Sequence, residues 1–497
     1  MPLQITNTLS GKKEAFVPLE KGRVRMYVCG PTVYGLTHVG NARPAVFFDV
    51  ARRYFEHSGF KVTFVSNYTD VDDKIIDRAR QEGIPAMEVA EKYIREFRKD
   101  MSDLGVRPPD EAPRVTENIP QIIAIIDGLV NNSHAYVTEG EVFYSVRRFR
   151  TYGKLSGKNI DELLAGTRVD PSEKKRDPLD FSLWKPRKAA DEPAWPSPWG
   201  DGRPGWHIEC SAMAARYLGE TLDIHGGGID LAHPHHENEI AQSEGFSGKP
   251  FARYWLHNNL VAINNEKMSK SLGNIFLNRD FIARYTAETL KFLLLAGHYR
   301  SPIDFSERQI RVSQAALHRV YSALARASEL ALGARGPDGP ARTEDQALAE
   351  MLLAFSARWH EAMDDDLNTA KVVGQVFELV RAANACFSRK GFRAEQHHVS
   401  YAGDFLARMK DVSAILNLFA EQPRPYLVLL RGHVLRDRGV DPARVETLVR
   451  ERSEARSRKD FQAADRLRDE LAALGIEVRD GPNGSDWDIA FTADGMV

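Results

Sequence analysis

The chain has 497 residues, which is long enough for two to four domains. Its 43% hydrophobic and 27% charged residues are typical of an ordinary soluble globular protein. No stretch approaches the roughly 18 apolar residues that a membrane span needs, and the first residues lack the pattern of a secretory signal. We therefore predict a cytoplasmic protein with no membrane partner. A net charge of −2 does not exclude nucleic acid, because binding depends on where positive charge lies.

The first predicted elements belong to a parallel sheet. Residues 23–29 are a short apolar run that ends in a Gly-Pro loop, which predicts a buried strand. A helix is expected over 41–58 and a second strand over 61–67, and this order is the βαβ unit of a doubly wound sheet. Two more strands are predicted at 221–230 and 254–263. The fold class is therefore α/β, with a split, doubly wound, Rossmann-like parallel sheet.

An insertion separates the two halves of this sheet. Residues 120–204 contain a strand-like run at 141–146 and a return loop at 189–205 that is rich in proline and tryptophan. From residue 306 the pattern is helical nearly to residue 420, with a loop expected at 335–346.

The rest of the chain is a small unit that contains helices and a terminal hairpin. The predicted segments are the first half of the Rossmann-like domain (1–119), the insertion (120–204), the second half (205–305), a helical bundle (306–420) and a small mixed C-terminal domain (421–497).

Three cysteines are spread along the chain, and an odd, sparse set does not indicate a disulfide framework. Cys386 lies in an apolar helical run, which predicts a core position. Cys29 follows the first strand, at the edge where parallel sheets bind ligands. Cys210 and the pair His235 and Glu239 complete a candidate metal site.

The pair His235 and Glu239 is four residues apart, so a helix would place both side chains on one face. Together with the two thiols they form a ligand set suited to tetrahedral Zn²⁺. A purely structural zinc, or no zinc at all, remains an alternative. The carboxylate favours a site that leaves room for a substrate ligand, because structural sites are usually filled by Cys and His.

Two segments are candidates for nucleotide binding. His38, Gly40 and Asn41 lie near a helix start, where free N–H groups and the helix dipole attract phosphates. A plain helix cap is the alternative. Lys267 and Lys270 lie in a loop after a strand and can close over ATP to stabilise the departing pyrophosphate. An exposed basic loop is the alternative there.

These two segments resemble the H-x-G-N and K-M-S-K-S signatures of class I aminoacyl-tRNA synthetases. Further motifs resemble the cysteine-specific branch of that family, in order from about residue 20 to 310. They are CGPTVY from Cys29, NYTDVDDK from Asn67, GWHIEC from Gly205, HGGGID from His225 and PHHENE from Pro234.

Two departures from the family pattern stand out. Asn41 replaces the second His of the general signature, and it can still donate a hydrogen bond. His233, in the segment Leu231-Ala232-His233, adds an imidazole near the predicted metal where bulkier apolar residues are expected.

The resemblance implies an enzyme that activates L-cysteine with Mg·ATP and transfers it to tRNA(Cys), as a monomer with one Zn²⁺ per chain. It implies that Cys29, Cys210, His235 and Glu239 hold zinc. It implies that Thr69, Trp206 and His225 surround the bound cysteine, although Thr69 and Trp206 can also be packing residues. It implies an ATP-binding set of His38, Gly40, Asn41, Asp230, Lys267 and Lys270, of which His38, Asn41, Lys267 and Lys270 are catalytic.

Zinc suits an enzyme that must distinguish cysteine from serine. Packing differences of this size are worth only roughly 10–200-fold. A metal binds a soft thiolate in preference to a hydroxyl, so we expect no separate editing domain.

The C-terminal segment is the predicted anticodon-binding part. Residues 421–480 hold 13 Lys and Arg against 12 Asp and Glu, so this unit has no bulk positive charge. The resemblance offers Arg452 and Arg456 for phosphate contact and Trp487 for base stacking. A solvated charged helix and a core tryptophan are the alternatives.

Two other functions are alternatives: a related ligase that shares the zinc and ATP features, and a non-catalytic zinc- and RNA-binding relative that keeps the fold. A ligase that joins cysteine to an amino-sugar would lack the C-terminal unit. A non-catalytic RNA-binding relative would not need His38, Lys267 and Lys270. Both are therefore less consistent with the sequence than a tRNA ligase.

Overall fold

In a computed structural model the chain forms two compact units. The first contains the residues up to Leu260 and two returning segments, Tyr299–Pro302 and Met363–Leu367, and the second contains the remainder. Among the described residues, no helix is long and apolar enough to cross a membrane. The structure describes residues 2–160, 162, 174–263, 266–267, 276–333, 339–389, 391–481 and 484–491.

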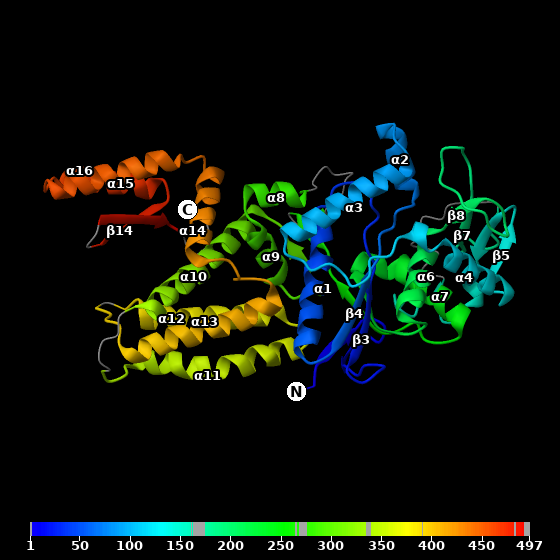
Figure 1. The fold of residues 1–497 in the computed structure, drawn as a ribbon, viewed down its shortest axis with the longest axis horizontal. Coiled ribbons are helices and arrows are strands. Elements are labelled where there is room, and N and C mark those ends of the chain that lie inside the picture. Colours follow the sequence, from blue (N-terminus) through cyan, green and yellow to red (C-terminus); the bar gives the residue numbers. More distant parts are fainter. Residues whose placement is uncertain are drawn as a thin grey trace. The chain divides into compact units, whose positions relative to one another are not determined.

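A four-stranded parallel sheet forms the centre of the first unit, with strand order β10-β9-β3-β4; its strands β3 and β4 are labelled in Figure 1. In β3, Tyr27 pairs with Val65 of β4 on one side and with His225 of β9 on the other. All three side chains are fully buried, as expected for a strand covered on both faces. The predicted α/β class is confirmed. The strands are β3 (Arg23–Val28), β4 (Lys61–Ser66), β9 (Leu222–Gly228) and β10 (Ala252–Asn258).

Helices accompany this sheet, and α1 packs against β4 and β10. Helix α1 begins directly after His38, and its Phe48 and Phe55 are fully buried. The helices of the first unit are α1 (Val39–His57), α2 (Asp73–Glu82), α3 (Ala86–Asp103), α4 (Ile119–Asn131), α6 (Trp206–Leu218) and α7 (Glu237–Ser247). Short turns are η1 (Val115–Glu117), η2 (Val146–Arg148), η3 (Ile229–Leu231) and η4 (Ala232–His236).

The insertion forms its own antiparallel sheet, with order β5-β6-β7-β8. Its hydrophobic residues continue into the core around α4 and α6, and Trp184 is fully buried there. The strands are β5 (Ala135–Thr138), β6 (Glu141–Tyr144), β7 (Phe181–Pro186) and β8 (Gly202–Pro204), and a separate hairpin is formed by β1 (Gln4–Asn7) and β2 (Lys12–Ala15).

The single strand predicted over 254–263 is wrong. Strand β10 ends at Asn258, and β11 (Val261–Ile263) pairs in another sheet with β12 (Glu266–Lys267) and β13 (Ile303–Asp304). The carbonyls of Asn259 and Leu260 accept hydrogen bonds from the Arg43 side chain instead of from a neighbouring strand. The break therefore comes from a long-range contact that periodicity does not encode.

The second unit is mostly helical, as predicted, and α10, α12 and α13 pack together (Figure 1). The loop expected at 335–346 ends earlier, because α11 starts at Thr343 with the Asp345 carboxylate accepting from the Arg342 N–H at 2.8 Å. The helices are α8 (Asn278–Arg284), α9 (Ala287–Leu295), α10 (Glu307–Leu332), α11 (Thr343–Asp364), α12 (Thr369–Phe387), α13 (Gln396–Leu416), α14 (Pro423–Asp437), α15 (Pro442–Ser457) and α16 (Phe461–Ala473). The predicted hairpin is β14 (Ile476–Gly481) with β15 (Gly484–Ile489).

Candidate metal and nucleotide site

The residues that are predicted to bind a metal lie at the carboxyl end of the central sheet. Cys29 directly follows β3, and Cys210 lies in α6. A side chain at Gly30 would collide with the carbonyl of Asn67, at 1.6 Å from its Cβ, so glycine is required for the two strand ends to approach. The Gly30 N–H instead donates to Asn67 Oδ1 at 2.9 Å.

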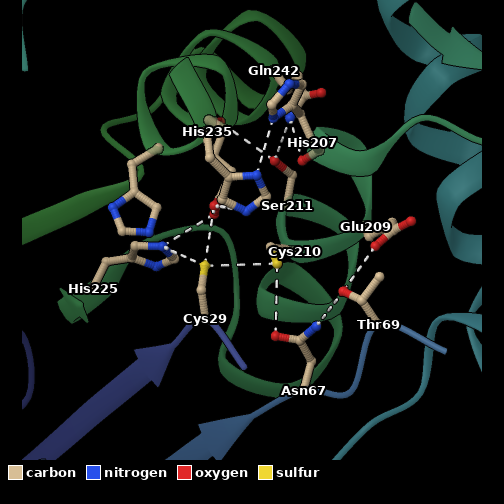
Figure 2. A network of polar contacts seen from close by, with 12 residues as sticks. Cys29, Asn67, Thr69, His207, Glu209, Cys210, Ser211, His225, His235 and Gln242 are labelled. Atoms are coloured by element: carbon tan, nitrogen blue, oxygen red, sulfur yellow. Dashed lines mark hydrogen bonds and ion pairs between the residues drawn. The ribbon is translucent and has the colours of Figure 1, made fainter. Parts of the chain in front are cut away.

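The four predicted ligands come together. The sulfurs of Cys29 and Cys210 are 3.7 Å apart, and Cys29 Sγ lies 3.3 Å from Glu239 Oε1. His235 Nε2 lies 2.9 Å from the same Glu239 oxygen. One ligand atom from each of these residues falls within a group no wider than 4.8 Å. Figure 2 shows the cysteine and histidine side chains pointing toward one another.

This geometry fits a tetrahedral zinc ion. Two sulfurs bound to one zinc at about 2.3 Å lie about 3.8 Å apart in a tetrahedron, close to the separation found here. The two cysteines are free thiols. A second possible set contains Cys29, His225, His236 and Glu239. The first set supplies two thiolates, and His236 Nδ1 lies 2.8 Å from His257 Nε2, so we favour the first.

His235 does not lie inside a regular helix, as the four-residue spacing predicted. It belongs to the turn η4, where His233 has extended backbone angles, and α7 begins only at Glu237. The contact with Glu239 forms nevertheless. His233 belongs to neither ligand set.

Protonation differs among the four ligands. The hydrogen bond from the Cys29 thiol lowers the pKa of Cys210 to about 6. Burial raises the pKa of Cys29. Burial also disfavours a charged His235, but the Glu239 carboxylate outweighs it and raises the pKa of His235 to about 10. Protons on Cys29 and His235 must therefore leave when a metal binds.

A second layer of side chains supports the ligands, and the sequence did not single it out. His207 Nδ1 lies 3.0 Å from His235 Nδ1. Gln242 donates to the His207 carbonyl at 2.8 Å and to the Ser211 hydroxyl at 2.9 Å (Figure 2). Such partners orient metal ligands. His207 and His236 lie inside the GWHIEC and PHHENE motifs, which was the available signal.

The residues assigned to the amino acid surround this cluster. Thr69 is buried and donates to Glu209 at 3.2 Å. His225 Nε2 lies 3.6 Å from Cys29 Sγ. Trp206 is the first residue of α6, and Gly205 is the N-cap residue directly before that helix. Its ring lies 4.4 Å from that of His235, and the residue is 37% exposed.

The structure describes only some of the residues that are predicted to bind ATP. His38 precedes α1, its N–H donates to Asn41 Oδ1 at 3.2 Å, and the first turn carries no acidic residue. Asp230 is exposed and lies in η3, after the glycines of β9. Lys267 ends β12, whereas Lys270 lies outside the described residues.

The C-terminal residues that are predicted to contact RNA form ion pairs or hydrogen bonds with acidic side chains. Both terminal nitrogens of Arg452 donate to Asp480, at 2.8 and 3.0 Å, and Arg452 is 7% exposed. Arg456 is more exposed and pairs with the same carboxylate. Trp487 Nε1 donates to Glu446 at 3.2 Å. Their contact with RNA stays a prediction.

Comparison with known proteins gives full-length relatives. A family described as "tRNA synthetases class I (C) catalytic domain" matches residues 15–315, "DALR domain" matches 358–420 and "Cysteinyl-tRNA ligase anticodon binding domain" matches 441–487. A cysteine–tRNA ligase of Geobacter metallireducens is 50% identical over 98% of this chain and 100% of the relative. One of Geobacter sulfurreducens is 50% identical with the same coverage.

Solved structures agree at the level of the fold. A Mycobacterium tuberculosis methionyl-tRNA synthetase in complex with methionyl-adenylate has a TM-score of 0.55 at 16% identity. The match covers 85% of this chain and 94% of that one.

Proposed function

The chain belongs to the cysteine–tRNA ligase family of class I aminoacyl-tRNA synthetases, and from this premise we propose that a zinc ion selects its amino acid through the thiol. The observation that carries the proposal is the convergence of two thiols, an imidazole and a carboxylate on one buried point. The proposed ligands are Cys29, Cys210, His235 and Glu239.

The reaction has two steps. The cysteine carboxylate attacks the α-phosphate of ATP, which gives cysteinyl-adenylate and pyrophosphate. A ribose hydroxyl of the tRNA then attacks the adenylate carbonyl, which gives cysteinyl-tRNA and releases AMP. Little covalent work falls on side chains, so positioning and charge stabilisation dominate. A bound zinc ion would supply a soft Lewis acid that prefers a thiolate to a hydroxyl.

Protein groups around the ligands would hold the rest of the amino acid. His225 borders the Cys29 sulfur, and Thr69 accepts from the Asn67 side chain. The half-exposed Trp206 ring lies next to His235 at the surface side of the cluster. Its indole would exclude water once cysteine is bound. A drier site strengthens the electrostatic interactions inside it.

ATP is proposed to bind at the start of α1, with Mg²⁺ bound to its phosphates. Backbone N–H groups near Gly40 and the absence of acidic residues in the first turn suit an anion. His38 and Asn41 would donate to the phosphates, and Asp230 would accept from the ribose. Lys267 and Lys270 would neutralise the charge that develops on pyrophosphate.

We propose the same domain boundaries and domain roles as those predicted from the sequence. Residues 1–119 and 205–305 would form the catalytic domain, 120–204 an insertion, 306–420 a helical domain and 421–497 the anticodon-binding domain. Arg456 is better exposed for a phosphate than Arg452, and Trp487 would offer a stacking face. The protein is proposed to act as a cytoplasmic monomer.

Metal removal tests the central proposal. Purified protein should contain about one zinc per chain, and chelation should abolish cysteine-dependent ATP–pyrophosphate exchange until Zn²⁺ is restored. Serine should be at least roughly 10⁴-fold poorer in kcat/KM, the discrimination that translation requires. Active protein without zinc, or comparable use of serine, would rule out thiol selection by the metal.

A further inference from the structure

A buried arginine lies on α1 close to the proposed ATP site. Arg43 follows Asn41 by two positions and is 2% exposed. Burial lowers the pKa of Arg43 to about 10, so the guanidinium remains charged at neutral pH. A cation held this deeply needs several hydrogen-bond acceptors to replace water.

Main-chain carbonyls from two separate segments supply those acceptors. One terminal nitrogen of Arg43 donates to the carbonyls of Asn259 at 2.6 Å and Leu260 at 2.7 Å. The other donates to the carbonyls of Tyr299 at 3.0 Å and Ser301 at 2.5 Å. A planar guanidinium can reach four oxygens in this way, whereas a lysine ammonium offers three donors from one atom.

Both segments are places where the chain passes between the two units. Leu260 is the last residue of the first unit before the chain continues into β11, β12 and the lysine motif. Tyr299 is the first residue after the chain returns. A single side chain therefore holds both the departure and the return of the segment that carries Lys267 and Lys270.

The return passage has further anchors, and the departure is bonded to it: the Asn259 N–H donates to the Tyr299 carbonyl at 2.8 Å and the Asn259 side chain donates to the Arg300 carbonyl at 2.9 Å. Tyr299 donates through its hydroxyl to Asp366 at 2.8 Å, and Arg300 Nε donates to the same buried carboxylate at 3.0 Å. The Tyr299 ring also stacks on Phe47 with centroids 4.2 Å apart. Loss of Arg43 should therefore loosen the hold of α1 on both passages together.

We propose that Arg43 is a positioning residue for ATP activation, which fixes the start of α1, with His38 and Asn41, against the Asn259–Leu260 and Tyr299–Ser301 passages. The inference rests on the proposed ATP roles of His38 and Asn41. These two residues stabilise a transition state only if the start of α1 is held in place, and a displacement of about 1 Å can cost roughly 10²-fold in rate.

The test compares Arg43→Lys with Arg52→Lys in the full-length, zinc-loaded protein. Arg52 lies on the same helix, is 9% exposed and donates to Glu56 at 3.0 Å and to the Pro108 carbonyl at 2.8 Å. It therefore controls for the loss of a buried guanidinium. Pyrophosphate exchange, the KM values for ATP and cysteine, zinc content and the thermal midpoint are measured for both.

Arg43→Lys should lower kcat for exchange roughly 10²-fold, with the KM for cysteine and the zinc content close to wild type. Arg52→Lys should change kcat less than about threefold, in line with a role in stability alone. Guanidinium ions should restore part of the exchange rate of Arg43→Ala, while ethylammonium should not, because the fork geometry is needed.

Three results would overturn the inference. They are an unchanged kcat in Arg43→Lys, a parallel loss of zinc, cysteine binding and ATP activation, and failure of both Arg43→Lys and Arg43→Gln to fold. Lys270→Ala is measured in the same series and should lose roughly 10²–10³-fold. If Lys270→Ala keeps the wild-type rate, the proposed ATP site fails and the Arg43 inference with it. If only Arg43→Lys keeps it, the inference alone fails.

Discussion

Two buried clusters of cysteine, histidine and carboxylate side chains lie in different units of this protein. The first contains Cys29, Cys210, His235 and Glu239. In the second, ligand atoms of Asp345, His397 and His398 also lie within 4.8 Å of one another, and Cys386 donates to Asp345 at 3.1 Å. By residue type alone, both are candidates for a metal.

The second cluster already contains a positively charged side chain, the guanidinium of Arg389. Arg389 pairs with both oxygens of Asp345, which outweighs burial and keeps the pKa of that carboxyl well below its usual range. The Glu395 N–H donates to His398 Nδ1 at 3.1 Å, so a neutral His398 carries its proton on Nε2 and directs it at Asp345, 3.1 Å away. That nitrogen has no lone pair left for a metal.

Charge and proton positions therefore separate two sites that look alike in composition. Burial raises the pKa of Cys386 to about 12, whereas the pKa of Cys210 is lowered to about 6. One thiol serves as a neutral donor that ties α12 to α11, and the other is ready to act as a thiolate ligand. The following predictions test this distinction, from the largest expected effect to the smallest.

The largest effect is expected from Cys210→Ser. Loss of a thiolate ligand should remove the metal and lower cysteine-dependent exchange roughly 10³-fold, since a bound metal supplies several kcal/mol. Metal analysis and exchange assays measure both, and Cys386→Ser is the matched control that should keep its zinc. Equal metal content in the two variants would show that the clusters do not differ as described.

Asp345→Asn tests the second cluster. The change leaves Arg389 buried without its carboxylate, and breaking a buried pair from one side costs about 3–5 kcal/mol. The urea midpoint of unfolding should fall, while zinc content per folded molecule stays at the wild-type value. A loss of zinc in this variant would instead indicate a metal at Asp345.

Gln242→Leu probes the second layer of the first cluster. It removes the donor to the His207 carbonyl and to Ser211, so His207 should orient His235 less well. We expect roughly tenfold weaker zinc binding, the lower end of the range for such partners. Competition with a chromophoric chelator measures it, with Gln314→Leu, a buried glutamine of α10, as the control. Equal zinc affinities in the two variants would show that Gln242 does not support the zinc ligands.

The smallest effect is a pH dependence from Cys386. Its folded pKa is raised to about 12, so its contribution to stability is fully present below the unfolded pKa and is lost as pH rises toward 12. Above about pH 9, the free energy of unfolding should fall by at most about 1.4 kcal/mol per pH unit more in wild type than in Cys386→Ala. Denaturant titrations at pH 8, 9 and 10 measure the difference, and identical slopes would contradict it.

Much of the fold follows from local patterns. The strands at β3 and β4, the helix between them and the terminal hairpin appear where periodicity and turn residues predicted them. The break at Asn259 does not, because an arginine more than two hundred positions earlier takes the carbonyls that a continuous strand would use.

Recognisable motifs indicated the candidate site but not its surroundings. The ligand residues stood out because their types and motif context suggest metal chemistry, and the structure brings them within reach of one ion. Gln242 and Arg43 carry no such signal, because a glutamine or an arginine on a helix is most often exposed. Their importance comes from burial and from the distant groups they contact.

The amino-acid sequence by itself determined the order of elements, the class of fold and the residue types available for zinc and ATP, because these depend on neighbours within a few positions. Only the tertiary structure decided how charges and protons are arranged in the two similar clusters. Charge and proton position depend on groups brought together from distant segments, such as Arg389 on Asp345 and Cys29 on Cys210.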